Sequence, residues 1–184
     1  LMSRSISIAN THVRLLSAED NLLQVALHTA KHTYVRAPGF RLHTDVDRVV
    51  RSTQINWDKF VNEVCALEVK TAVYLSLALA ETLLRTPIPE NVLMKLKPGR
   101  LKTKILVGWL CRVGLFDPDG KKWGRFGYII FVCLLYDNAS GLFKSIFPSA
   151  NVIRSHYPNS KMKPLAWLYF IRAIDLIKNR VLVK

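Results

Sequence analysis

The chain has 184 residues, of which 50% are hydrophobic and 22% charged, a composition that excludes intrinsic disorder and allows one sizeable core with a small appendage. Its three cysteines are widely spaced, which excludes a disulfide scaffold or a cysteine-based metal site and favours a cytoplasmic setting. The formal net charge of +14 predicts attraction to polyanions, although a solvated basic surface without a specific partner would give the same count.

The first predicted elements are an extended lead-in and two helices. Residues 1–16 have an extended or strand-like pattern. Ser17 then has the character of an N-cap, and apolar residues recur at helical spacing until Pro38-Gly39 ends the helix. A shorter helix is predicted from about Arg41 to Arg51.

The next part contains the helix that we expect at the centre of the fold. Asn56 can cap one helix, and Lys70–Leu84 is then apolar nearly all round, which is typical of the most buried helix. Pro87 stops this helix, and Pro89 suits the first position of a short new one. Glu81 interrupts the apolar run, so we expect a buried carboxylate that is paired with an arginine, with a catalytic acid as the alternative.

The remainder is helical in pattern but more basic. Helices are predicted over Leu101–Leu115, Trp123–Tyr136 and Pro164–Val183, with a strand as the alternative for the second because it contains β-favouring residues. Residues 117–120 form a predicted turn. The last helix is basic and amphipathic; we expect it to close the bundle, with binding to an anionic membrane as the alternative. No apolar run reaches the roughly 20 residues of a bilayer-spanning helix.

Few strand signals occur, so the predicted class is all-α. We expect an irregular bundle of about seven to nine helices around one buried central helix. Three regions are predicted: an extended lead-in over residues 1–16, a helical core over 17–98, and a basic helical extension over 99–184 that packs on the core.

Asp45 and Asp47 form an Asp-x-Asp pair, which can chelate Mg²⁺ when both carboxylates lie on the same side of a strand. Here the pair falls in a helical pattern, in which residues two apart point about 200° away from each other. No Gly-Ser dipeptide precedes the pair to cradle a phosphate. The sequence therefore predicts no catalytic metal site here.

His28 and His32 are four residues apart on one predicted helix, so their rings lie on the same face. Three interpretations remain open: a structural pair, a polar functional pocket, or a metal site. The zinc-hydrolase motif His-Glu-x-x-His is excluded, because Thr29 stands where that motif requires glutamate.

The densest run of basic residues predicts an anion-binding surface, with a solvated face as the alternative. Trp109 and Trp123 are nearby in the sequence and could stack nucleic-acid bases beside the cations. The basic residues of this run are Lys95, Lys97, Arg100, Lys102 and Lys104.

Several of these segments together resemble the C-terminal helical half of an uncharacterised nucleotidyltransferase-like family. The resemblance covers roughly residues 13–98 and extends more loosely to Tyr157; Asn56 departs from it, because the family often has aspartate there. The segments are Leu15–Leu23 (LLSAEDNLL), Leu27–His32 (LHTAKH), Asp45 within a helix, Ile55–Asp58 (INWD) and Pro87–Pro89 (PIP).

The resemblance implies that the catalytic carboxylates belong to an N-terminal α/β lobe, which would bind Mg²⁺ with a nucleoside triphosphate and to which nothing in this chain corresponds. It also implies that His28, His32 and Asp45 could face a nucleotide pocket when that lobe is present. Within this chain we expect no catalytic residue and no metal ligand, so that the chain alone would be inactive.

The predicted function is accordingly that of an accessory helical domain of a nucleotidyltransferase-like protein, which binds nucleotide or an anionic acceptor through its basic surface. Its expected partners are nucleotide or nucleic acid and a catalytic lobe or partner protein. The alternative is a helical module without enzymatic activity that binds nucleic acid, a membrane surface or another protein.

Overall fold

The computed structural model describes residues 6–7, 14–32, 39–113, 124–157 and 163–177. Within these residues, one pair of two-residue antiparallel strands, β1 (Ile6–Ser7) and β2 (Arg14–Leu15), precedes ten helices, so the all-α class is confirmed with one helix more than expected. The helices are α1 (Ala18–His32), α2 (Gly39–Ser52), α3 (Trp57–Ala66), α4 (Lys70–Leu84), α5 (Glu90–Leu96), α6 (Arg100–Val113), α7 (Gly124–Leu135), α8 (Ala139–Ile146), α9 (Ala150–His156) and α10 (Leu165–Ile177).

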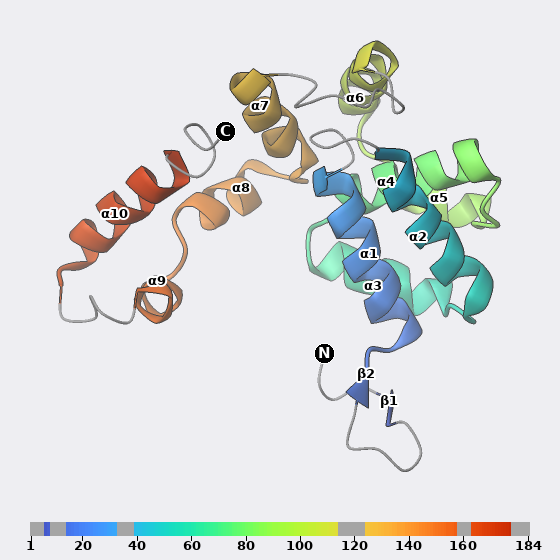
Figure 1. Ribbon diagram of the computed structural model, residues 1–184, viewed down its shortest axis with the longest axis horizontal. Helices are drawn as coiled ribbons and strands as arrows, with labels where there is room; N and C mark the ends of the chain where they lie inside the picture. Colours follow the sequence, from blue (N-terminus) through green and yellow to red (C-terminus); the bar gives the residue numbers. More distant parts are fainter. Residues whose placement is uncertain (1–5, 8–13, 33–38, 114–123, 158–162, 178–184) are drawn as a thin grey trace.

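The helices form a body and an arm (Figure 1). Helices α1 to α5 gather in the body, which has the β1–β2 pair below it. Helices α6 and α7 lie at the upper edge of this body, and the arm of α8, α9 and α10 leads away from it to the left. No helix in the described ranges has the length and hydropathy needed to cross a membrane.

Two of the helix starts follow from local capping, as the sequence predicts. The Ser17 hydroxyl accepts a hydrogen bond from the backbone N–H of Asp20 at 3.2 Å and donates one to the Asp20 carboxylate at 2.9 Å. The Asn56 side chain accepts one from the backbone N–H of Lys59 at 3.0 Å. Each cap satisfies an N–H group that has no partner inside its own helix.

Helix α4 is the central helix of the body and has the predicted bounds, from Lys70 to Leu84. It packs against α1, α2, α3 and α5, and it ends at Arg85, whose φ of 52° is in the left-handed region. The buried side chains of this core are Leu22, Leu23, Ala26, Val46, Val50, Phe60, Val61, Val64, Val73, Leu77, Ala80, Ile88, Val92 and Leu96.

A second buried cluster attaches α6 and α7 to the body. Leu106 of α6 and Phe131 and Leu135 of α7 pack with Ala30, Ala72 and Leu75 of α1 and α4. Residues 124–135 form the helix α7, so the alternative of a strand in this segment was wrong.

The start of α4 has a cap that comes from a distant part of the chain. Val69 precedes the helix and makes no side-chain cap. Instead, the two carboxylate oxygens of Asp137 accept hydrogen bonds from the backbone N–H groups of Lys70 and Thr71, both at 2.7 Å. Because Asp137 lies between α7 and α8, this cap joins the arm to the body.

Two expectations about charged helices need correction. Glu81 pairs with Arg85 at 3.9 Å as predicted, but its side chain is 39% exposed and is therefore not a buried carboxylate. The last helix was expected to close the bundle, but α10 packs on α9, away from α1 to α5 (Figure 1). Residues 178–183 of that predicted helix lie outside the described residues, as does the predicted turn over 117–120.

Candidate functional site

Most of the acidic residues in the segments that carry the resemblance have structural contacts. Glu19 is buried at the start of α1, where its carboxylate accepts hydrogen bonds from the backbone N–H of Asn56 at 3.2 Å and from the Lys59 ammonium at 3.1 Å. Burial alone would raise the pKa of Glu19, but hydrogen bonds from its own backbone, from Asn56 and from Lys59 lower it on balance. The segment Ser-Ala-Glu-Asp therefore caps α1 and ties it to α3.

We expect Glu19→Gln to lower the free energy of unfolding by about 1 to 2 kcal/mol, because the amide keeps the shape but loses the charged partner of Lys59. Urea denaturation followed by circular dichroism at pH 7 measures this change. Asp58→Asn is the matched control, since the ion pair of Asp58 with Lys95 is exposed. Equal effects of the two substitutions would contradict the structural role of Glu19.

Asp45 and Asp47 both lie on α2 and have different surroundings. Val46 between them is fully buried, and Asp45 is exposed. The Asp47 carboxylate accepts hydrogen bonds from Arg51 at 2.8 Å and from the Thr86 hydroxyl at 2.7 Å, which fastens α2 to the end of α4. The pair therefore lies on a helix as predicted, and Asp47 has a structural role.

His28 and His32 are close to each other near the end of α1. Their ring centroids are 4.6 Å apart; the His28 side chain is exposed and that of His32 is half-buried. Asp45 is on the neighbouring helix α2, which is held to α1 by a 3.1 Å hydrogen bond from the Thr29 hydroxyl to the Leu42 carbonyl. In the described ranges, no group of three or more His, Cys, Asp or Glu side chains is arranged to hold a metal ion.

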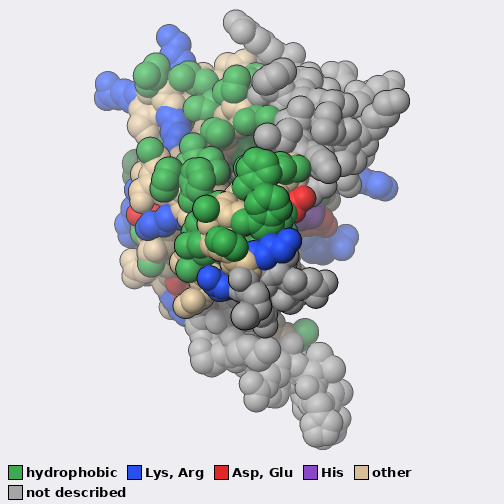
Figure 2. Space-filling view, turned by 90° about the vertical axis from the view of Figure 1, so that its left-hand side faces the viewer, with side chains coloured by type: hydrophobic (Ala, Val, Ile, Leu, Met, Phe, Trp, Pro, Cys, Tyr) green, Lys and Arg blue, Asp and Glu red, His purple; other side chains and the backbone are tan. Residues whose placement is uncertain are grey.

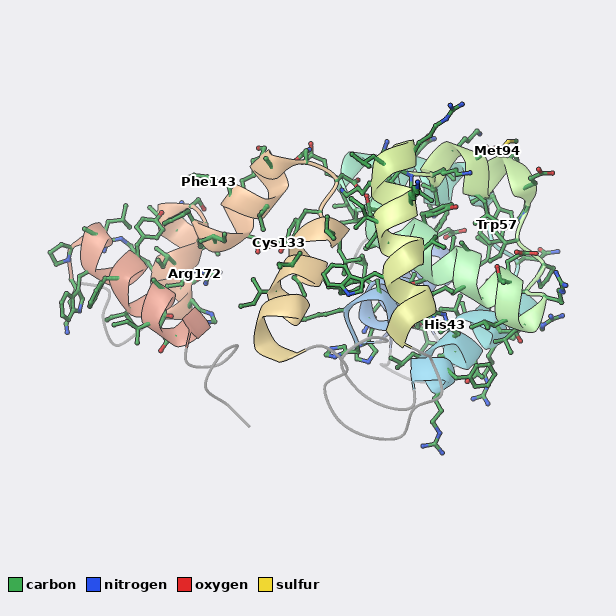
Figure 3. All side chains as sticks on the ribbon, turned by 90° about the horizontal axis from the view of Figure 1, so that it is seen from above. His43, Trp57, Met94, Cys133, Phe143 and Arg172 are labelled. Atoms are coloured by element: carbon green, nitrogen blue, oxygen red, sulfur yellow. The ribbon has the colours of Figure 1, made fainter. Side chains whose placement is uncertain are left out.

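His43 is a titratable residue that the sequence analysis did not single out. It is fully buried between helices, and desolvation lowers its pKa from 6.5 to about 4, although a hydrogen bond with the backbone of Ser76 opposes this shift. A sequence signal did exist, because His43 shares with Val46 and Val50 the spacing that defines the inward face of α2. Figure 3 labels His43 in the body.

The basic run divides into engaged and solvent-facing cations. Lys95 forms an ion pair with Asp58 at 3.3 Å. Lys102 turns inward, where it donates hydrogen bonds to the Tyr136 carbonyl and, at 3.4 Å, to the Thr71 hydroxyl. Burial lowers the pKa of Lys102, while the nearby Asp137 carboxylate raises it.

Three cations of the run remain at the surface, and we call them the basic edge: Lys97, Arg100 and Lys104. Lys97 is the C-cap of α5, and Arg100 and Lys104 are four residues apart on α6. All three are exposed, and none has an ion-pair or hydrogen-bond partner among the described residues. Four residues is the spacing that places two side chains on the same face of a helix, so Arg100 and Lys104 point to the same side.

Of the two tryptophans expected to stack bases beside this run, the structure describes Trp109, whose ring is packed inward. The Trp109 ring packs edge-on against Phe131 at 6.1 Å, so it belongs to the second buried cluster. Trp123 lies outside the described residues. The described residues of the basic edge therefore contribute cationic groups, of the kind that suit a phosphate.

Comparison with known proteins connects the first 85 residues of the chain to one family. Residues 1–85 match the family model described as "Uncharacterised nucleotidyltransferase", which confirms the resemblance over that part of the chain. The match ends at Arg85, the left-handed residue that terminates α4, so it covers less than half of the 184 residues. No curated protein and no solved structure matches the chain.

Proposed function

Because residues 1–85 match the uncharacterised nucleotidyltransferase family, we propose that the chain is an accessory helical domain of a nucleotidyltransferase-like protein. In this proposal the basic edge binds the phosphates of a nucleotide or of an anionic acceptor. The transfer chemistry, with Mg²⁺ and a nucleoside triphosphate, would take place on a catalytic lobe or partner protein.

The observation that carries the proposal is the uncompensated charge of the basic edge. Arg100 and Lys104 are exposed, and no described carboxylate neutralises them, whereas Lys95 and Lys102 of the same run are engaged. A guanidinium presents a planar fork of donors to phosphate, and an ammonium adds a mobile point charge. An arginine and a lysine on one helix face therefore suit a phosphate group.

His28, His32 and Asp45 are the second part of the proposal. They lie at or near the surface of α1 and α2, within the segment that matches the family. By contrast, Glu19, Asp20 and Asp47 are committed to caps and cross-links. We therefore assign the exposed His28 and Asp45, with His32 beside His28, to a nucleotide pocket that is completed by a catalytic lobe.

We expect the full chain to bind Mg-ATP or short single-stranded oligonucleotides, with an affinity that falls as salt rises. Arg100→Gln combined with Lys104→Gln should weaken binding about tenfold and reduce the salt dependence by roughly 1.4 in log–log slope for a single strand. Fluorescence titrations across a salt series would measure both changes.

The matched control removes two exposed cations from the arm, through Lys144→Gln and Lys163→Gln. This double variant changes the net charge by the same amount as the double substitution in the basic edge. If the basic edge is the site, the variant should keep the wild-type affinity within about twofold, because salt screens the effect of charges on the arm. No binding at low salt, or the same loss in both double variants, would refute the proposal.

A further inference from the structure

Helix α10 has its charged side chains turned toward the protein. The Arg172 guanidinium donates hydrogen bonds to the backbone carbonyls of Ser145 at 2.8 Å and Ile146 at 3.1 Å, both at the end of α8. The Asp175 carboxylate accepts one from the Tyr157 hydroxyl at 2.7 Å, just after α9. Together with the fully buried Leu168, these residues define the inner face of α10.

The opposite face of α10 is apolar and exposed. Trp167 is 45% exposed and Phe170 is 56% exposed, and their ring centroids are 5.7 Å apart. Ala166 and Ala173 are also exposed, and helical spacing places them on the same side. A helix with charges inside and aromatic rings outside reverses the usual arrangement of a water-facing helix.

Helix α8 extends this apolar surface. Phe143 is 63% exposed, and its ring centroid lies 4.8 Å from that of Phe147. The ring centroid of Phe147 lies in turn 5.9 Å from that of Tyr169 in α10. Figure 2 shows hydrophobic side chains gathered in the middle of the face at the arm end of the molecule, with Lys and Arg side chains beside them. Figure 3 shows that Phe143 and Arg172 lie on the arm, well apart from Trp57 and Met94 of the body.

The charges of the arm limit what can cover this surface. The described residues of α8 to α10 and their connections include four cations, Lys144, Arg154, Lys163 and Arg172, and one acid, Asp175, which is engaged on the inner face. A second copy of this chain would bring the same positive charge against the surface, which opposes association. An anionic surface would be attracted to it.

The residues at the edge of this apolar surface suit one kind of anionic partner in particular, the surface of a lipid bilayer. The Lys163 ammonium lies 5.4 Å from the centre of the Trp167 ring. At a lipid bilayer, tryptophan lies at the level of the headgroups, and an adjacent lysine can reach the lipid phosphates while its stem covers apolar surface. The 13 residues of α10 span about 20 Å, too short to cross the hydrocarbon core but suitable for lying in the interface.

We propose that the outer face of α10, together with Phe143 of α8 and Phe147 just after α8, docks on the surface of an anionic lipid bilayer, with Lys144 and Lys163 at the headgroups. This places the arm on a membrane and leaves the basic edge on α6 available for the phosphate ligand. The two surfaces are then separate sites.

The test is co-sedimentation of the full chain with vesicles of phosphatidylglycerol and phosphatidylcholine, and with vesicles of phosphatidylcholine alone. We expect binding to the anionic vesicles that is at least tenfold tighter than to the neutral ones and that weakens with salt. Trp167→Ser with Phe170→Ser should reduce binding to anionic vesicles at least tenfold. Lys144→Gln with Lys163→Gln should reduce it roughly thirtyfold.

Two matched controls separate this surface from other exposed residues. Met94→Ser with Leu101→Ser removes two exposed apolar side chains of the body and should leave vesicle binding unchanged. Arg100→Gln with Lys104→Gln removes the basic edge and should weaken vesicle binding less than about threefold. The Trp167/Phe170 variant should also keep the wild-type affinity for nucleotide, so failure of either proposal can be recognised separately.

Three results would overturn the docking proposal. The first is no binding to anionic vesicles at low salt. The second is vesicle binding that the Trp167/Phe170 substitutions leave intact while the protein stays folded. The third is a dimer in light scattering that these substitutions dissociate, because a second copy would then cover the surface.

Discussion

Asp137→Ala is expected to lower the free energy of unfolding by about 3 kcal/mol, because it leaves two backbone N–H groups at the start of α4 without a partner. Those groups, of Lys70 and Thr71, now donate to the two oxygens of Asp137 at 2.7 Å each. The negative charge of the Asp137 carboxylate also interacts favourably with the positive end of the α4 dipole. The first turn of α4 contains no acidic residue that could replace it.

Hydrogen exchange and urea denaturation can check this expectation together. The amides of Lys70 and Thr71 should exchange faster in Asp137→Ala, and Asp137→Asn should lose about half as much stability because one acceptor oxygen remains. Asp58→Ala is the control: its side chain is 84% exposed, so it should cost less than about 1 kcal/mol. An equal cost for Asp58 and Asp137 would show that the distant cap contributes no more than an exposed ion pair.

The protein is expected to be about 2 kcal/mol less stable at pH 5 than at pH 7 because of His43. The pKa of His43 is about 4 in the folded protein, whereas the value for the unfolded chain is 6.5. At pH values between these two, the unfolded chain binds a proton at His43 and the folded protein does not. The contribution of His43 is complete above pH 6.5 and is lost as the pH falls toward 4.

Urea denaturation at a series of pH values, with His43→Gln beside the wild type, would test this. The glutamine variant should lose most of the difference between pH 7 and pH 5, whatever its absolute stability, because it has no titrating group at this position. The contribution of Glu19, whose pKa is lowered from 4.5, is lost only at more acidic pH. As a control, His156→Gln should keep the difference in stability between pH 7 and pH 5, because the His156 ring is exposed. Equal stability of the wild type at both pH values would contradict the expectation.

How much the sequence could predict depends on the range of the interaction. Ser17 and Asn56 cap helices through bonds to residues three positions away, so their roles could be read from the chain alone. The span of α4 and the separation of Asp45 from Asp47 follow equally from helical periodicity. The family resemblance also rested on sequence order, and it was confirmed over residues 1–85.

The positions of the predicted site residues were harder to predict from the sequence. Lys95, Lys97, Arg100, Lys102 and Lys104 appear as one basic run in the sequence, yet two of them are engaged by distant partners. Nothing local distinguishes Lys102 from Lys104, because the difference arises only when α6 packs on α4 and α7. Sequence reasoning could therefore identify the cationic region but not the members of the basic edge.

By itself, the sequence determined the helical class, the central helix, the local caps and the excess of positive charge, all of which depend on composition or on spacings within one helix. Tertiary structure decided that Asp137 caps a helix 66 residues away, that Glu19 joins α1 to α3, and that α10 turns Arg172 inward and Trp167 outward. The physical reason is that a helix fixes the relative directions of its own side chains, whereas the partner each direction meets depends on how separate helices pack.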